Sequence, residues 1–123
     1  MNKGLTLIEV MISLAVIGIV ITPLISMFVV SAKINGESNL KLKSIFAAQK
    51  YMEEIKASEK MNFDDYVYNS SAKSYERTVA QTAHELGALI RIKTERSYFY
   101  LIEVVVYDNG NEIYSLSGSK IIN

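Results

Sequence analysis

The sequence predicts an α+β protein, in which one long N-terminal helix packs against a small antiparallel β-sheet. The run from Leu5 to Val30 is almost entirely apolar, with Glu9 as its single ionisable side chain. The segment after it has the three- and four-residue spacing of an amphipathic helix. Residues near the C-terminus instead alternate with a two-residue period and are rich in β-branched and aromatic types, as strands are.

The apolar run is long enough to cross a membrane. Residues 5–30 would form a helix roughly 39 Å long at about 1.5 Å per residue, against a hydrocarbon core of about 30 Å. A secretory signal peptide fits poorly, because its apolar region has only about 7–15 residues and because Ser31-Ala32-Lys33, at the end of this run, is a poor cleavage site. A plain signal anchor leaves Glu9 unexplained, because an acidic residue in a spanning segment usually marks function. The run is also not expected to be a buried helix of a soluble domain, because the rest of the chain is too small to cover such a helix.

Pro23 is the predicted break in this helix. Proline removes one backbone hydrogen bond and disfavours helical geometry in the residue before it. Thr22 or neighbouring helices can satisfy the freed carbonyl. Small residues would let other helices approach closely, namely Ser13, Gly18 and Ser26.

Residues 31–60 are expected to continue the helix into water and to end it near residues 58–60. Asn35-Gly36 is a candidate bend. The predicted apolar stripe consists of Ile34, Leu42, Ile45, Ala48 or Gln49, Met52 and Ile55.

Residues 61–123 are expected to form the sheet domain. Residues 61–74 are predicted to form a loop, and Tyr66 to Tyr68 are expected to pack against the helix. Strands are predicted at 74–82, 89–93 and 97–107, with Ile90 and Ile92 sharing one face. On the third strand one side carries Tyr98, Tyr100, Ile102, Val104 and Val106, and the other carries Phe99, Leu101, Val105 and Tyr107. Asp108-Asn109-Gly110-Asn111 predicts a hairpin turn, after which 112–116 return antiparallel and the tail from Gly118 extends the pairing.

The composition contains no sign of catalytic chemistry. The 13 basic and 13 acidic residues cancel, so nucleic-acid binding is not predicted, and the chain has no cysteine. His84 is the only histidine, and its neighbour Glu85 cannot face the same way on a helix or a strand. Asp64-Asp65 reads as an exposed turn. We therefore expect no enzyme activity, no catalytic residue, no cofactor and no metal.

The N-terminal residues resemble a known processing signal. Lys3 followed by Gly4-Leu5-Thr6-Leu7-Ile8-Glu9-Val10, ahead of a long apolar helix, looks like the class III signal of type IV prepilins, a family that includes the pseudopilins of type II secretion and competence. The resemblance implies that a prepilin peptidase cleaves after Gly4 and that Leu5 is then N-methylated. The family usually has phenylalanine where this chain has Leu5.

The resemblance also implies a domain organisation. Residues 1–4 would be the leader, 5–30 the transmembrane and filament-core helix, 31–60 its amphipathic continuation and 61–123 the small sheet domain. Glu9 would meet the N-terminal ammonium of a neighbouring subunit and set the assembly register. Lys3 would stay on the cytoplasmic side of the plasma membrane, so the protein would cross the membrane once with its C-terminal domain outside. After assembly, the protein would lie in a surface pilus or pseudopilus.

The expected partners are other pilin or pseudopilin subunits, the peptidase, the inner-membrane assembly platform, and membrane lipid before assembly. The block from Ala47 to Lys56 resembles the PilV-type minor pilins and the I-type pseudopilins. The sequence therefore favours a minor pilus subunit that primes or caps the filament. A pseudopilin of type II secretion or competence DNA uptake remains an alternative, as does a permanently membrane-anchored binding or adhesion module.

Overall fold

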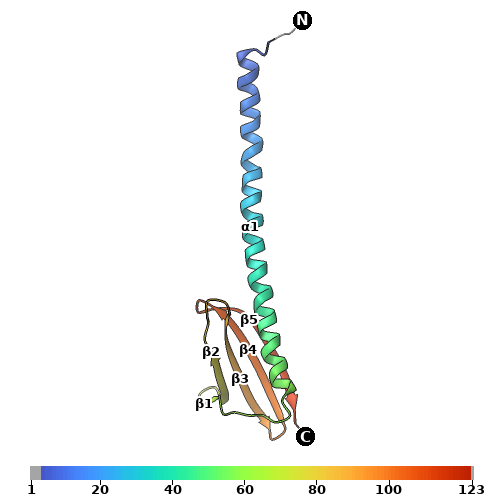
Figure 1. Cartoon of the computed structure of the whole chain (residues 1–123), viewed down its shortest axis with the longest axis vertical. Helices are drawn as coiled ribbons and strands as arrows, with labels where there is room; N and C mark the ends of the chain where they lie inside the picture. The colour runs from blue at the N-terminus through green and yellow to red at the C-terminus, as the bar shows by residue number, and fades with distance from the viewer. Residues whose placement is uncertain (1–3, 123) are drawn as a thin grey trace. The chain divides into compact units, whose positions relative to one another are not determined.

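A computed structural model describes residues 4–122 of the chain. It contains a helix, α1 (Leu7–Ala57), and strands β1 (Val67–Asn69), β2 (Ser74–Val79), β3 (Gly87–Arg96), β4 (Phe99–Asp108) and β5 (Asn111–Ile121) (Figure 1). The chain divides into two compact units, with the boundary between Ser38 and Asn39. The predicted α+β class is confirmed, because a long N-terminal helix packs against a five-stranded antiparallel sheet.

The first unit is helical from Leu7 to its end, and the helix continues through Pro23. Pro23 therefore lies within an unbroken α-helix, so no unwound patch occurs there, and a kink at Pro23 stays a prediction. Proline has a backbone φ that suits a helix, and it withholds only the hydrogen bond to the carbonyl four residues earlier. The Thr22 hydroxyl donates to the Gly18 carbonyl oxygen at 3.0 Å, so it does not serve the carbonyl that Pro23 frees. The candidate bend at Asn35-Gly36 is helical too.

In the second unit, the helix buries a narrower face than the predicted stripe. Its buried residues are Ser44, Ala48, Met52 and Ile55, which recur every three or four positions. Leu42 was expected in this stripe but is 51% exposed. Ser44 takes a core position, and its hydroxyl donates to the Lys41 carbonyl oxygen at 2.7 Å. Because that bond satisfies the hydroxyl, a polar residue can be buried there at little cost.

The five strands follow one another in the sheet in the order β1-β2-β3-β4-β5, and every neighbouring pair is antiparallel. The predicted faces of β3 and β4 are confirmed. One face meets the helix and carries the fully buried Ile90, Ile92, Ile102, Val104 and Val106. Alternate residues of the same strands point to the other face, as the pleat requires.

The predicted hairpin turn joins β4 to β5. Asp108 pairs with Asn111, and the two residues between them have positive φ, 49° at Asn109 and 80° at Gly110. Positive φ at both central positions defines the type I′ turn, for which Asn-Gly is the favoured pair. The pairing shifts between Val106 and Tyr107. The predicted extension of the return strand by the tail is confirmed, because β5 pairs with β4 as far as Ile121 opposite Phe99.

Strand β1 was not predicted, since residues 61–74 read as a loop. It has only three residues and pairs with β2 across the turn that follows Asn69. The Asn69 side-chain oxygen accepts the backbone N–H groups of Ser71 and Ala72 at 3.0 and 3.2 Å, which closes that turn. Strand β2 ends at Val79, short of the predicted Thr82.

Two glycines mark close approaches of the elements. A Cβ at Gly118 would lie 3.0 Å from the Met52 sulfur, so the absence of a side chain lets the helix pack against β5. A Cβ at Gly87 would lie 2.2 Å from the ring of Tyr107, which covers that glycine from the neighbouring strand. The Tyr107 hydroxyl then donates to the Val79 carbonyl oxygen at 3.1 Å and so ties β4 to β2.

Candidate functional site

The start of α1 is organised by Thr6 and Glu9. Thr6 is the residue before the helix, and its carbonyl oxygen accepts the backbone N–H groups of Glu9 and Val10 at 3.1 and 3.2 Å. Its hydroxyl oxygen also accepts the N–H of Glu9, at 3.4 Å. Thr6 is therefore the N-cap, and Glu9 occupies the third helical position, where a carboxylate complements the positive end of the helix dipole. The Thr-x-x-Glu spacing is that of a capping box.

Thr6 was predicted only as part of the processing motif, and its role as the N-cap was not predicted. The signal was present, since Thr or Ser followed three residues later by Glu, just before an apolar run, marks a helix start.

Gly4 and Leu5 lie directly before this cap and are not helical. Both are exposed, Leu5 to 74%, and a side chain at Gly4 would meet no heavy atom within 4 Å. The backbone between them is thus accessible. Residues 1–3, which include Lys3, lie outside the described residues.

The carboxylate of Glu9 is exposed, and no hydrogen bond or ion pair joins it to another residue of the described chain. It is the only ionisable side chain between Gly4 and Val30. The structure therefore brings an accessible glycine, a helix cap and a single carboxylate within six consecutive positions of the chain.

The helix that follows is apolar and uncovered. It is long and apolar enough to cross a membrane, and its most apolar stretch is not buried within the chain. Three hydroxyl groups in it donate back to helix carbonyl oxygens: Ser13 to Glu9 at 2.8 Å, Thr22 to Gly18 at 3.0 Å and Ser26 to Thr22 at 3.1 Å. Such bonds let serine lie in an apolar helix without an unsatisfied donor. An apolar surface of this size has to be covered by lipid or by other chains.

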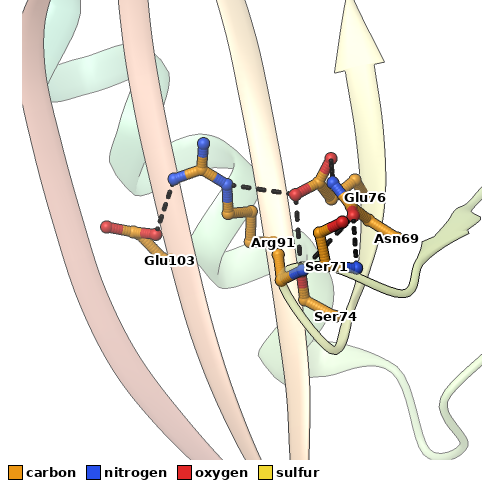
Figure 2. A network of polar contacts seen from close by, with 7 residues as sticks. Asn69, Ser71, Ser74, Glu76, Arg91 and Glu103 are labelled. Carbon is orange, nitrogen blue, oxygen red and sulfur yellow. Dashed lines mark hydrogen bonds and ion pairs between the residues drawn. The ribbon is translucent and has the colours of Figure 1, made fainter.

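A polar network lies on the face of the sheet away from the helix (Figure 2). The Arg91 guanidinium bridges Glu76 at 3.3 Å and Glu103 at 3.2 Å. Glu76 also accepts hydrogen bonds from the Asn69 amide at 3.2 Å and from the Ser74 hydroxyl at 3.4 Å. These residues come from four adjacent strand or turn segments, so the network joins β1, β2, β3 and β4. One guanidinium is shared by two carboxylates, so the network has a net charge of −1, and its contacts link neighbouring strands of the sheet.

A small pocket of about 160 Å³ lies beside the end of α1, where Tyr66 and Arg77 line it with Glu54 and Asp65. Burial of the Tyr66 ring raises the pKa of its hydroxyl, and the nearby Arg77 acts in the opposite direction. Within the part of the chain that the structure describes, no group of three or more His, Cys, Asp and Glu residues could hold a metal ion. His84 and Glu85 are both exposed, in the segment between β2 and β3.

The sequence model of the prokaryotic N-terminal methylation motif matches residues 1–25. No curated protein and no solved structure matches the chain. The matched residues include Gly4, Leu5, Thr6 and Glu9, the residues that organise the helix start. A methylation motif followed by a long, uncovered apolar helix supports a type IV pilin-like or pseudopilin precursor.

Proposed function

We propose that this chain is a minor structural subunit of a type IV pilus, processed after Gly4 and assembled through its N-terminal helix. One observation carries the proposal. An exposed, non-helical Gly4-Leu5 bond directly precedes a capped apolar helix, and the lone carboxylate of that helix lies in its first turn.

The first step is cleavage of the Gly4-Leu5 bond by a prepilin peptidase. A peptidase needs an accessible, extended substrate backbone, and the N-cap at Thr6 ends the helix before the bond to be cut. Cleavage exposes the Leu5 amine, which is then N-methylated. Leu5 is apolar, as the usual phenylalanine is, so its side chain can enter the same apolar environment.

The second step is recognition between subunits through Glu9. Once the leader is removed, the new Leu5 ammonium and the Glu9 carboxylate lie about one helical turn apart along the chain. The carboxylate has no partner among the described residues, so it can accept the ammonium of a neighbouring subunit. A buried charge is stable only when it is paired, so subunits out of register would leave two unpaired charges. Glu9 therefore selects the register of assembly.

The third step is transfer of the helix from lipid to the filament. The apolar side chains from Leu5 to Val30 are exposed on the single chain, and they would be covered first by lipid and then by equivalent helices. Lipid and the filament core are both apolar, so moving between them changes little hydrophobic free energy. The direction of transfer would then depend on helix packing, on pairing of the terminal charges and on work supplied by the assembly platform.

A small head and one helical block support the minor role. The head, the second compact unit of the chain, consists of residues 39–57 of α1 and the five strands. In the block from Ala47 to Lys56, Ala48, Met52 and Ile55 are buried against the sheet, so packing accounts for these positions. The exposed residues of the block remain available for contact with another subunit at the tip or during priming, namely Gln49, Lys50, Glu53, Glu54 and Lys56.

The test is to replace Gly4 and Glu9 separately in the full chain, in cells that carry the assembly machinery. Gly4→Ala should leave the uncleaved precursor in the membrane, because the peptidase would no longer accept the bond. Glu9→Gln should be cleaved and methylated normally but should enter sheared surface fibres poorly. Intact-mass measurement of the membrane and fibre fractions follows both steps. Gly36→Ala is the matched control, since Gly36 also has open space around it but lies outside the motif.

A functional protein that keeps its leader would overturn the proposal and favour a permanently anchored binding module. Normal incorporation of Glu9→Gln would remove the role of Glu9 in the register while leaving the processing step in place. A pseudopilin would be processed in the same way, but it would be found with a secretion or DNA-uptake system and not in the sheared surface fibres.

A further inference from the structure

The turn between β4 and β5 carries an exposed asparagine-glycine pair, Asn109-Gly110. From these observations we infer that Asn109 is a site of spontaneous deamidation, where the side-chain amide is converted to a carboxylate. Asn109 and Gly110 are both exposed at the tip of the hairpin. A Cβ at Gly110 would meet no heavy atom within 4 Å beyond its chain neighbours, so the space beside this residue is open.

Asn109 differs from two other turn asparagines of the chain. The side-chain oxygen of Asn62 accepts the N–H of Asp64 at 2.9 Å, and that of Asn69 accepts two backbone N–H groups. No hydrogen bond joins the side-chain amide of Asn109 to another described residue. Asn109 therefore has a side chain that can rotate toward the following backbone nitrogen.

The reaction needs only water as a co-reactant. The Gly110 backbone nitrogen loses its proton to solvent base and attacks the Asn109 side-chain carbonyl carbon. A nitrogen–carbon bond forms, the bond from that carbon to the amide nitrogen breaks, and the nitrogen leaves as ammonia. Water then opens the resulting five-membered imide at either carbonyl and yields aspartate or isoaspartate. No atom is oxidised or reduced.

Gln81 restrains this turn. Its side-chain oxygen accepts the Asn109 backbone N–H at 2.8 Å, and its side-chain nitrogen donates to an Asp108 carboxylate oxygen at 2.5 Å. Both bonds hold the turn with positive φ at Asn109 and Gly110. Ring closure requires a different backbone torsion between the two residues, so the turn has to open first. The reaction rate therefore follows the population of the opened turn.

The chain contains the same dipeptide in a second setting. Asn35-Gly36 is also exposed, but it lies inside α1. Helical torsions and the helix hydrogen-bond ladder hold its backbone far more firmly than a hairpin tip is held. We expect Asn35 to stay unmodified while Asn109 reacts.

The modification would change the head of the protein at one defined place. It adds a negative charge beside Asp108 and Glu112. The isoaspartate product also lengthens the backbone by one carbon, which a type I′ turn cannot accommodate. The end of the β4-β5 hairpin should loosen with age, while the rest of the sheet keeps its pairing.

The experiment ages the full-length chain in detergent at mildly alkaline pH and maps its peptides by mass spectrometry. The expected result is aspartate and isoaspartate at 109 and neither at 35. Gln81→Ala should raise the rate at 109 by about tenfold, the change that a loss of about 1.4 kcal/mol in turn stability produces. Gln49→Ala, an exposed glutamine on the helix, is the control and should leave the rate unchanged.

A sample aged in denaturant supplies the reference, because there both asparagines are unrestrained and should react at similar rates. If Asn109 in the folded chain reacts as slowly as Asn35, the proposal is overturned. If Gln81→Ala and Gln49→Ala give equal rates, the restraint assigned to Gln81 is wrong.

Discussion

Replacement of Gly87 by alanine should destabilise the sheet domain, although alanine is normally the better strand residue. The new Cβ would lie 2.2, 2.5 and 2.9 Å from three carbon atoms of the Tyr107 ring. Carbon atoms pack at about 3.5–4.0 Å, so the ring has to move by about 1 Å or more. The ring cannot move freely, because the Tyr107 hydroxyl donates to the Val79 carbonyl oxygen at 3.1 Å.

The magnitude follows from three contributions. Overpacking a close contact costs about 1–3 kcal/mol. Loss of the tyrosine hydrogen bond costs about 1 kcal/mol. Alanine in a strand gains about 0.5–1 kcal/mol over glycine. The net expected loss in the free energy of unfolding is therefore about 2 kcal/mol.

The assay is urea unfolding of the full chain in detergent, followed by the near-ultraviolet circular dichroism of the tyrosines. The decisive control repeats Gly87→Ala in a Tyr107→Ala background, where the ring is gone and the added methyl group meets no obstacle. There the substitution should be neutral or slightly stabilising, which gives a coupling energy of about 2 kcal/mol. Equal destabilisation in both backgrounds would refute the argument, because the cost would then not come from the ring.

Three further substitutions test other contacts. Lys120 donates from its ammonium to two carbonyl groups at the end of α1, so Lys120→Met should lower the unfolding free energy by about 1–2 kcal/mol, measured by the same urea titration. Thr6→Ala should remove the N-cap and weaken the helix start by about 0.5–2 kcal/mol, whereas Thr6→Ser should retain it; amide hydrogen exchange in the first turn distinguishes them. Burial raises the pKa of Tyr66 above its ordinary value of 10.0, so the folded state favours the neutral phenol. The unfolding free energy should therefore fall as the pH rises above about 10. Tyr66→Phe should make the unfolding free energy less dependent on pH in this range, and an unchanged dependence would contradict the assignment of this effect to Tyr66.

Elements with a strong local signal were predicted well. Ile90 and Ile92 on β3, and Ile102, Val104 and Val106 on β4, alternate with outward-facing residues, and this period alone assigns them to the buried face. The turn at Asn109-Gly110 was predictable because only a few residue types tolerate positive φ at both positions. Gly4, Leu5 and Glu9 were assigned to the candidate site from one short motif, and their roles in processing and register stay predictions.

Contacts between distant segments were not predictable from the chain alone. Strand β1 has three residues, too few for a periodic signal, and it forms because β2 supplies its hydrogen-bond partners. Ser44 displaced Leu42 from the buried stripe, because the angle at which the sheet meets the helix decides which face is covered. Strand register places Tyr107 against Gly87, and packing of the helix on the sheet places Lys120 at the end of α1.

The amino-acid sequence by itself determined the α+β class, the spanning-length helix with its single carboxylate, and the buried alternation of the strands. Each of these depends on residue type and spacing within one segment, which a linear reading captures. The tertiary structure alone decided the continuity of the helix through Pro23, the exact helix face that packs, and the tyrosine-over-glycine and lysine-to-helix contacts. These depend on which segments meet in space, and their energies arise only when residues far apart in the chain come within a few ångströms of one another.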